Sequence, residues 1–566
     1  MNSEREPGGR LEQLLRGIRS VLKGGAVDHV PRPPDAPTPA SPAPAPLPTA
    51  SELINEGLRQ RQEHGVAAAR PFFETAALLA PNSHVPFFML GNVASDLGDL
   101  DTAVRHYEHA RDLHPSDHVV RYNLGLNHLW RGYVDLAIEE LRGACNLNPA
   151  YLQAQSTYIM ALHNSDRVSA EAIAAATSEW GARFALQHPE ASPSSLRSDA
   201  GLTEVLHVGF VSGDFRTHSV AHFFEPIASA HDRGAFKYVF YSTSRQQDMV
   251  TQRLQTYCDV WREVAALNDD TLMELIRTDR IDILVDLAGH TDLNRLSAFA
   301  RRAAPVQVSY LGYPDSTGLA TMDYRITDAI TDPEPVADAW HCERLLRLPD
   351  SQWCFRPFGT LASSGPLPAL EAGFVTFGSF NNMSKVSDTV LHCWTHILAS
   401  LPASRLRLTR IRSAQRAAEI VKLFGALGVD NDRIDCVPYC SDAPYGLQFA
   451  GVDIALDPYP YNGVTTTCES LYFGLPVISL HGRHGVSRSG LSILSNLGLR
   501  ELVASTPEQY AEIAVSLALD LPRLESLRAS LRPRFEQSSL RNEKRLAANF
   551  EELLRTAWRQ LSVIVE

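Results

Sequence analysis

Two hydrophobic patterns follow one another along the chain and meet near residue 200. Between about residue 50 and residue 188 the sequence has the pattern of packed helix pairs, whereas past residue 203 short apolar runs alternate with helical stretches. The second pattern is typical of parallel α/β sheets. The chain is therefore predicted to fold as an all-helical region followed by α/β domains.

The helical region repeats with a period of 34 residues. Five columns agree across three copies: Gly57, Gly91 and Gly125; Ala69, Ala103 and Ala137; Ala76, Ala110 and Ala144; Leu79, Leu113 and Leu147; and Pro81, Pro115 and Pro149. This period, with small residues where helices cross and a proline after the second helix, is the pattern of tetratricopeptide repeats. Phe73, Tyr107 and Leu141 are predicted to fill the space between the helices. Segments between 150 and 188 predict a fourth, degenerate pair. Such an array either serves as a scaffold or presents protein substrates to the domains that follow.

The α/β part contains two series of strand-like runs. We expect the strands of a first sheet at 206–211, 238–241, 281–285 and 306–310, and those of a second at 374–377, 406–408, 434–437, 454–456 and 477–480. Two such Rossmann-like units create a cleft at the carboxyl ends of their strands, where ligands of these sheets bind. The predicted fold class is thus a two-Rossmann-domain α/β protein preceded by an all-α tetratricopeptide-repeat superhelix.

Composition and these patterns together divide the chain into five segments. Nine prolines between 31 and 48 predict an extended tether after a short amphipathic helix. The predicted segments are an N-terminal helix (1–25), a proline-rich linker (26–50), the repeats (51–200), a first Rossmann-like domain (201–365) and a second one (366–566).

Charge and cysteine content narrow the class of partner and compartment. The 566 residues carry a formal net charge of −13 and contain no block of five basic residues, so a nucleic acid is not the expected partner. The eight cysteines form no CxxC pair, and no run of eighteen apolar residues occurs. We therefore expect a reduced, cytoplasmic protein that does not engage a membrane.

The loop at 462–469, with the sequence NGVTTTCE, predicts an anion site. It follows the expected strand 454–456 and precedes a helix. Glycine lets the backbone approach a ligand, threonine hydroxyls and free N–H groups donate to phosphate oxygens, and the helix start adds partial positive charge. A diphosphate is the expected ligand, and Glu469 is placed to accept from a ribose diol. The alternative is a plain helix cap.

Other candidates follow strands of both sheets. His218 and His290 come after the strands 206–211 and 281–285, where an imidazole can take a proton or serve as a satisfied loop histidine. Leu311 and Gly312 begin a turn that either approaches a sugar or is only a turn. Lys385 follows the strand 374–377 and is the expected cation for a departing diphosphate. No DxD-type aspartate pair stands beside these motifs, which favours leaving-group catalysis without a metal.

Taken in order, these motifs resemble the O-GlcNAc transferase and SPINDLY group of protein O-glycosyltransferases. The matching runs are VGFVSGDFRTHSV (208–220), APVQ (304–307), LGYP (311–314), DYRITD (323–328), FGSFNN (377–382) and TTTCESL (465–471). The resemblance covers about residues 205–560 and extends to the repeats. It implies a GT-B type fold and an inverting transfer, independent of a metal or cofactor, from a nucleotide sugar to Ser or Thr of proteins guided by the repeats.

The resemblance also implies roles for individual positions. His218 matches the histidine near the acceptor and Lys385 the lysine on the diphosphate, so both are the expected catalytic residues. The expected donor-binding set is Asn382, Lys385, Tyr445, Asn462, Gly463, Thr465, Thr466, Thr467 and Glu469, with His290, Leu311 and Gly312 near the sugar or acceptor. The chain differs from O-GlcNAc transferases at two of these donor-binding positions and at one neighbouring position. Glu469 replaces an aspartate, Tyr445 replaces a histidine beside the base, and Val464 replaces a histidine that contacts phosphate.

The donor remains open between two nucleotide sugars. The motif sequences are more similar to those of SPINDLY, and this resemblance implies GDP-fucose as the donor. Resemblance to the broader family implies UDP-GlcNAc. We take UDP-GlcNAc as the expected donor and GDP-fucose as the alternative. Two rivals from other classes are a nucleotide-sugar epimerase, which would have no evident use for the repeats, and a non-catalytic repeat scaffold, which would need decayed cleft residues.

Overall fold

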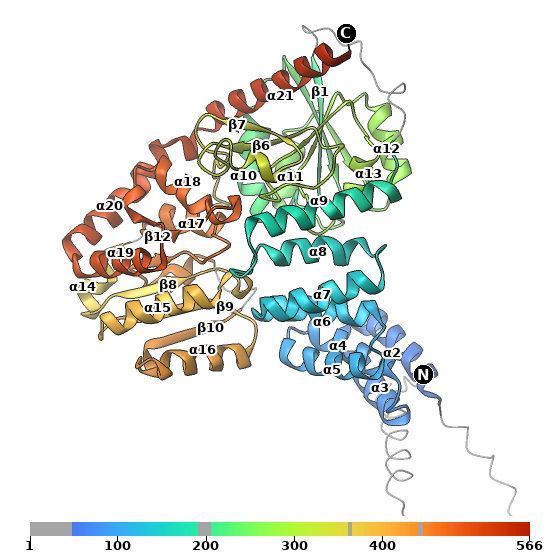
Figure 1. The fold of residues 1–566 in the computed structure, drawn as a ribbon, viewed down its shortest axis with the longest axis horizontal. Coiled ribbons are helices and arrows are strands. Elements are labelled where there is room, and N and C mark those ends of the chain that lie inside the picture. Colours follow the sequence, from blue (N-terminus) through green and yellow to red (C-terminus); the bar gives the residue numbers. More distant parts are fainter. Residues whose placement is uncertain (1–47, 191–204, 360–364, 440–444, 566) are drawn as a thin grey trace, which may run out of the picture. The chain divides into compact units, whose positions relative to one another are not determined.

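A computed structural model describes residues 48–190, 205–359, 365–439 and 445–565 (Figure 1). The predicted N-terminal helix at 1–25 and nearly all of the linker at 26–50 lie outside the described residues, and the predicted boundaries at 200 and 365 lie in or beside gaps, so these limits stay predictions. The chain divides into two compact units, one through Ser116 and one from Asp117.

The first unit contains two helix pairs of the repeat. They are α2 (Ala50–His64), α3 (Val66–Leu79), α4 (His84–Asp96) and α5 (Leu100–Leu113). The repeated glycines lie where the helices of a pair cross: a Cβ at Gly57 would stand 2.4 Å from the Phe73 ring, and one at Gly91 2.5 Å from the Tyr107 ring. The predicted small and large columns therefore pack against each other.

The second unit begins with two more helix pairs. They are α6 (His118–Arg131), α7 (Val134–Leu147), α8 (Leu152–Leu162) and α9 (Ala170–Gln187), so the degenerate fourth pair predicted between 150 and 188 is confirmed. Helix α9 packs directly on the backbone of the first α/β domain, because a Cβ at Gly181 would stand only 1.7 Å from the Gly318 carbonyl oxygen. The repeats and the α/β part of this unit are thus in close contact.

The first sheet has seven parallel strands in the order β3-β2-β1-β4-β5-β6-β7. The strands are β1 (Leu206–Ser212), β2 (Phe236–Ser242), β3 (Val260–Glu263), β4 (Ile283–Asp286), β5 (Val306–Ser309), β6 (Tyr324–Asp328) and β7 (Arg344–Leu348). The helices between them are α10 (Ser219–Ala230), α11 (Met249–Gln255), α12 (Asp269–Thr278), α13 (Leu296–Ala300) and the 3-10 turn η2 (Asp338–Trp340).

The second sheet has six parallel strands in the order β10-β9-β8-β11-β12-β13. The strands are β8 (Thr376–Ser379), β9 (Arg405–Ile411), β10 (Ile434–Pro438), β11 (Ile454–Leu456), β12 (Val477–Leu480) and β13 (Val503–Ala504). The helices are α14 (Pro368–Ala372), α15 (Asp388–Ser400), α16 (Ala414–Ala426), α17 (Thr465–Phe473), α18 (Ser489–Asn496), α19 (Pro507–Leu519), α20 (Leu521–Gln537) and α21 (Glu543–Val565). The 3-10 turns are η3 (Met383–Lys385), η4 (Asn431–Arg433), η5 (Tyr445–Phe449), η6 (Gly485–Ser487), η7 (Arg500–Leu502) and η8 (Ser539–Arg541).

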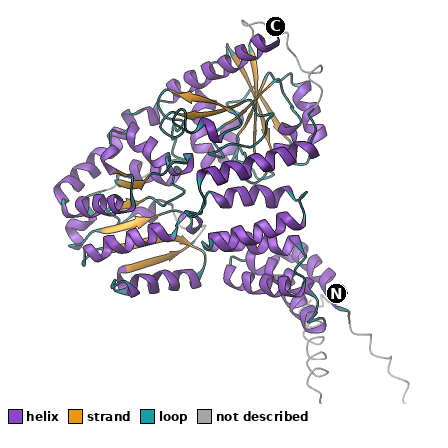
Figure 2. Ribbon diagram, in the orientation of Figure 1, coloured by secondary structure: helices purple, strands orange, loops and turns teal. Residues whose placement is uncertain are grey.

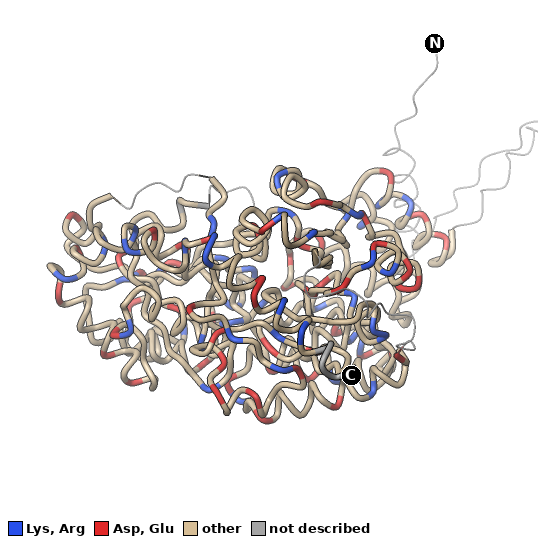
Figure 3. The backbone as a smooth tube through the Cα atoms, turned by 90° about the horizontal axis from the view of Figure 1, so that it is seen from above, with Lys and Arg blue, Asp and Glu red and all other residues tan. Residues whose placement is uncertain are grey.

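Both sheets are flanked by helices, as Figure 2 shows. The last helix, α21, returns from the second α/β domain to pack beside α10 on the first, where Glu551 accepts from the Asp232 N–H at 2.9 Å. The predicted architecture of paired parallel α/β units after helical repeats is confirmed. None of the described helices is both long and apolar enough to span a bilayer. Lys and Arg are interspersed with Asp and Glu over the described backbone (Figure 3), although strand β9 carries three arginines and no acidic residue.

Candidate active site

The predicted anion loop lies at the carboxyl end of β11 and leads into helix α17. The Gly463 N–H donates to Asp457 Oδ1 at 2.8 Å. A Cβ at position 463 would stand 2.3 Å from Thr466 Oγ1 and 2.8 Å from Thr467 Oγ1, closer than side-chain contacts allow. The loop therefore closes this tightly only because residue 463 is glycine.

The start of helix α17 is open to a ligand. No described side chain caps it, and Val464 occupies the N-cap position. The first N–H groups of a helix have no partner within the helix, so those of this turn are available as donors beside the positive end of its dipole. Thr466 Oγ1 donates to Asn381 Oδ1 at 2.9 Å, which ties the turn to the loop after β8. This is the geometry expected of a phosphate site.

Lys385 stands beside the same loop. Its Nζ donates to the Asn462 carbonyl oxygen at 3.2 Å and lies 3.9 Å from the centre of the Tyr461 ring. Burial lowers the pKa of Lys385 to about 8, although the negative charge of Asp457 opposes that shift. Burial likewise raises the pKa of Asp457 to about 6. At neutral pH the lysine therefore remains largely charged, held by an aromatic face and a carbonyl.

The remaining donor-side residues fall into different positions. Asn462 is fully buried, and its Nδ2 donates to the carbonyl oxygens of Pro458 at 2.9 Å and Leu480 at 3.2 Å, so this side chain braces the loop from within. Asn382 is exposed, and its Oδ1 accepts from Arg410 Nε at 2.9 Å. Glu469 is buried on α17. Tyr445 begins η5, but its side chain lies outside the described part.

His218 lies at the carboxyl end of β1, in the N-cap position of α10. Its Nδ1 stands 3.3 Å from Asp214 Oδ2 and 3.4 Å from the Val220 N–H. The histidine side chain is 39% exposed, whereas Asp214 is buried beneath it. Burial lowers the pKa of His218 despite Asp214, and burial raises the pKa of Asp214. The ring is therefore neutral at pH 7 and within reach of a ligand.

His290 is buried between the repeats and the first sheet. Its Nε2 approaches the Thr317 carbonyl oxygen at 3.0 Å and its Nδ1 approaches Ser156 Oγ at 3.2 Å. Its ring meets the edge of Trp180 with 4.4 Å between centroids, and burial lowers its pKa to about 4. Both ring nitrogens thus face protein atoms, as in the satisfied loop histidine considered above, and a role near the sugar stays a prediction.

Leu311 and Gly312 form a strained turn at the end of β5. Leu311 has a positive φ of 75°, a conformation that costs energy for a residue with a branched side chain. A Cβ at Gly312 would stand 1.8 Å from the Leu287 carbonyl oxygen, so the turn is pressed against the end of β4. Strain of this kind is often kept at functional sites, and a role for the turn near the sugar stays a prediction.

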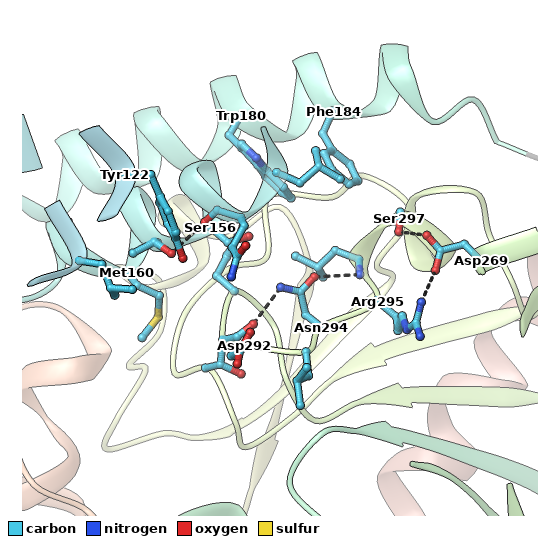
Figure 4. Close-up of a pocket in the computed structure, with 18 of the residues that line it drawn as sticks. Tyr122, Ser156, Met160, Trp180, Phe184, Asp269, Asp292, Asn294, Arg295 and Ser297 are labelled. Atoms are coloured by element: carbon cyan, nitrogen blue, oxygen red, sulfur yellow. Dashed lines mark hydrogen bonds and ion pairs between the residues drawn. The ribbon is translucent and has the colours of Figure 1, made fainter. Parts of the chain in front are cut away.

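A cavity of about 770 Å³ opens between repeat helices α6, α8 and α9 and the loop after β4. Figure 4 shows Tyr122, Trp180 and Phe184 on its helical side and Asp292 on the opposite loop. Arg295 on that loop donates to Asp269 at 3.1 Å. The cavity is lined by aromatic, acidic and basic side chains, with Arg295 paired to Asp269.

Three residues of this site were not among those predicted from the sequence. Asp457 lies beneath the loop and binds the Gly463 N–H, Tyr461 supports Lys385, and Asp214 contacts His218. Asp457 directly follows strand β11, so its place at the carboxyl end of a parallel strand was a signal that could have revealed it.

Within the described ranges, one set of side chains is arranged as a metal could bind it: His163, Asp315 and His484. None of these three residues was predicted at the donor site. The prediction that the donor site uses no metal stays a prediction.

The model of glycosyl transferase family 41 matches residues 185–354 and 364–550. The chain belongs to this family. Its two matched segments carry the first-sheet histidines and the whole donor loop, and the family predicted from the motifs is therefore confirmed.

Relatives agree in sequence and in structure. The chain is 37% identical over 421 residues to the SPINDLY protein of Petunia hybrida, which is named a probable UDP-N-acetylglucosamine–peptide N-acetylglucosaminyltransferase; the match covers 73% of this chain and 45% of that protein. The SPINDLY protein of Arabidopsis thaliana is also 37% identical, over 389 residues, which are 68% of this chain and 42% of that one. The chain thus spans less than half the length of these plant relatives.

A solved structure extends the likeness to the repeats. A lysine-to-methionine mutant of the O-GlcNAc transferase of Thermobaculum terrenum superposes with a TM-score of 0.82 at 33% sequence identity. The match covers 91% of this family 41 chain and 98% of that one. The order of repeats followed by two α/β units is therefore shared with a solved family member.

Proposed function

We propose that this chain transfers N-acetylglucosamine from UDP-GlcNAc to Ser or Thr hydroxyls of proteins, with inversion at the anomeric carbon. The observation that carries the proposal is the donor loop: a glycine-closed turn and an uncapped helix start, with Lys385 held beside them on Tyr461. A fixed cation and a helix N-terminus are the donors that a diphosphate leaving group requires in the absence of a metal.

The chemical step is a direct displacement at the anomeric carbon. The acceptor oxygen forms a bond to this carbon while the bond to the diphosphate oxygen breaks, and the electron pair leaves with the diphosphate. Negative charge then develops beside Lys385 and the N–H groups of α17. Because these donors are fixed before the reaction, they stabilise the transition state without reorganising.

The hydroxyl proton needs an acceptor, and we assign this role to His218. Two groups face Nδ1: the Val220 N–H donates to it at 3.4 Å, and Asp214 Oδ2 lies 3.3 Å away. Our assignment requires the Asp214 contact to prevail, which places the proton on Nδ1 and leaves Nε2 to accept. The lowered pKa keeps the ring neutral before the reaction, and Asp214 stabilises the imidazolium that forms. The exposed part of the ring gives the acceptor access.

The repeats supply the protein acceptor in this proposal. The cavity between α6, α8, α9 and the loop after β4 offers aromatic faces and the carboxylate of Asp292 to an extended chain, whereas Asp269 is already paired with Arg295. An array of stacked repeats forms a concave binding surface of this kind. Acceptor segments with apolar and basic residues near the modified hydroxyl fit this lining.

GDP-fucose is the second candidate donor. Both plant relatives reported above are SPINDLY proteins, although each is named a probable UDP-N-acetylglucosamine–peptide N-acetylglucosaminyltransferase. GDP-fucose is a candidate because the motif wording of the chain resembles that group. The same loop would hold the diphosphate of either donor beside Lys385. The two donors differ only in the base and the sugar.

Calorimetric titration of the full chain with UDP, GDP, UDP-GlcNAc and GDP-fucose separates these readings. We expect binding of UDP and UDP-GlcNAc, together with UDP release and a mass gain of one N-acetylhexosamine on acceptor proteins. Selective binding of GDP and GDP-fucose with a deoxyhexose mass gain would replace the donor.

Two further outcomes would overturn the proposal. Binding of no nucleotide would indicate a repeat scaffold. Conversion of the donor into a free epimeric sugar nucleotide, with no protein modified, would indicate an epimerase.

A further inference from the structure

Three histidines surround one buried aspartate where the repeats meet both α/β domains. His163 ends helix α8 of the repeats, Asp315 lies in the loop after β5 of the first domain, and His484 precedes η6 in the second domain. The side chains of these three residues are 0%, 3% and 10% exposed. His341, beside η2, approaches the other oxygen of Asp315 at 3.3 Å.

The ring of His163 is oriented by the backbone. Its Nδ1 lies 2.9 Å from the Ile159 carbonyl oxygen, which can only accept, so Nδ1 carries the proton. In the neutral ring Nε2 then presents a lone pair, and this nitrogen points at Asp315 Oδ2 from 2.6 Å. In metal-bound histidines a backbone carbonyl or a carboxylate holds one ring nitrogen and the other binds the metal, and the Ile159 carbonyl holds Nδ1 of His163 in this way.

His484 adds a second nitrogen to the same oxygen. Its Nε2 lies 3.1 Å from Asp315 Oδ2, within ion-pair distance, whereas its Nδ1 has no hydrogen-bond partner among the described residues. The Trp340 ring stacks on this imidazole with 5.8 Å between centroids and 11° between planes, which fixes its orientation. A buried ring nitrogen without a partner is costly.

With Nδ1 of His163 facing the Ile159 carbonyl, a proton on its Nε2 makes an ion pair with Asp315, and the Nε2–H tautomer of neutral His484 faces the same oxygen at 3.1 Å. This protonated cluster is the alternative to a bound cation. A cation at the centre accepts lone pairs from both rings and from the carboxylate together. The ligand atoms of the three residues all lie within 4.8 Å of one another, as a shared ion requires.

We propose that His163 Nε2, Asp315 Oδ2 and His484 Nε2 bind one Zn²⁺ ion that joins the repeats to both α/β domains. Two imidazoles and a carboxylate suit Zn²⁺, which binds such ligands at about 2.0–2.2 Å in tetrahedral geometry, and do not suit Ca²⁺ or Mg²⁺, which prefer oxygen ligands. The fourth position is left for water. The inference does not depend on the proposed transferase activity.

Metal binding is tested on the full chain, purified without a polyhistidine tag and treated with a chelator. Zn²⁺ alone is titrated by calorimetry, and Co²⁺ is added as a spectroscopic probe of tetrahedral coordination. We expect one Zn²⁺ per chain, visible absorption bands of tetrahedral Co²⁺, and a higher midpoint of thermal unfolding with Zn²⁺ than without it.

Ligand variants and a matched control locate the ion. We expect His484→Gln and Asp315→Asn each to weaken Zn²⁺ binding by about a hundredfold or more and to abolish the Co²⁺ bands. His231→Gln is the control: His231 is also buried and faces a carboxylate, Asp259 at 3.9 Å, but belongs to no three-ligand set found among the described residues. This variant should bind like the wild type.

Co²⁺ binding by the wild-type chain tests the proposal even if a variant fails to fold. A wild-type chain that takes up no tetrahedral Co²⁺ overturns the proposal and leaves a proton-bound histidine–aspartate cluster. Uptake that the His484→Gln variant retains, with circular dichroism showing it folded, overturns it as well, because the ion is then bound elsewhere.

Discussion

The donor loop of the second sheet and the histidines of the first sheet are built in opposite ways. In the donor loop, buried polar groups hold the loop in place and leave the N–H groups at the start of α17 open: Asp457 accepts from Gly463 and Thr467, and Lys385 donates to the Asn462 carbonyl. On the first sheet, His218 is partly exposed with one charged neighbour, whereas His290 is buried with both nitrogens facing protein atoms.

This difference follows from what each side has to do. A diphosphate has the same charge in every reaction cycle, so its site can be fixed in advance by backbone and buried charges. An acceptor hydroxyl arrives on different polypeptides, so the group that takes its proton has to remain accessible. We therefore expect removal of the fixed charge at the donor loop to cause a larger loss than substitution of the first-sheet histidine His218.

The largest expected effect is that of Lys385→Met. Methionine has an apolar side chain of similar length and removes the charge that lies over the Tyr461 ring beside the leaving group. Removing one fixed charge partner typically costs about 3–4 kcal/mol, so kcat should fall roughly a hundred- to thousandfold. Initial rates of UDP release measure the change. The control is Lys422→Met, an exposed lysine on α16, which should keep wild-type turnover; wild-type turnover by Lys385→Met would remove our main assignment.

His218→Gln is expected to have the next largest effect. Glutamine can still contact Asp214 but cannot take a proton, and general base catalysis contributes about 10²–10⁴-fold in rate. We expect kcat to fall about a hundredfold with little change in the KM for the donor. Steady-state kinetics with varied donor separate the two constants. A raised donor KM with unchanged kcat would show instead that His218 positions the donor.

The hydrophobic pattern of the sequence predicted the repeats and most strands because the buried positions of these elements are occupied by apolar residues. The period of 34 identified the glycine and aromatic columns that do pack together, as Gly57 and Phe73 show. Strand β6 was missed because it carries the buried charges of Arg325 and Asp328. Arg325 is neutralised by Asp332 at 2.7 Å and Asp328 accepts from Ser492, which is far away in sequence. Apolar patterning has no means of recognising such pairs.

The residues of the candidate site likewise fall into those that the sequence could predict and those that depend on distant contacts. The donor loop was predictable because its chemistry is contiguous in sequence. The contacts that hold the loop in place were not predictable, because they join residues far apart in the sequence. Thr466 donates to Asn381, and Lys385 donates to the Asn462 carbonyl oxygen. The difference between His218 and His290 also depends on the repeats, because Ser156 and Trp180 are what bury His290. Both histidines follow strands in the same way, so the sequence could not separate them.

Gly463→Ala tests whether the loop geometry itself binds the donor. The added Cβ would clash with both Thr466 and Thr467, and overpacking of this kind costs about 1–3 kcal/mol. We expect UDP affinity, measured by calorimetry, to fall about tenfold. The matched control is Gly425→Ala on α16, where the added Cβ meets only the movable Asn431 side chain at 3.0 Å. Equal UDP affinity in both variants would mean that the loop does not hold the diphosphate.

The smallest expected effect is the pH dependence of UDP binding, and its sign follows from Lys385. The pKa of this lysine is lowered to about 8, so the charge that holds the diphosphate is present below pH 8 and is lost as the pH rises through that value. Above about pH 7 the terminal phosphate is fully ionised and does not add its own titration. UDP affinity should therefore be nearly constant up to pH 8 and then fall by at most about tenfold per pH unit.

The Lys385→Met variant isolates this titration. It should bind UDP weakly at every pH and show no decline above pH 8, because the titrating group is gone. Protonation of Asp457, whose pKa is raised to about 6, removes a negative charge near the loop and acts in the opposite range, so it cannot mimic the alkaline decline. If the decline persists in the methionine variant, the affinity depends on another group, and the preformed charge of the donor loop does not reside on Lys385.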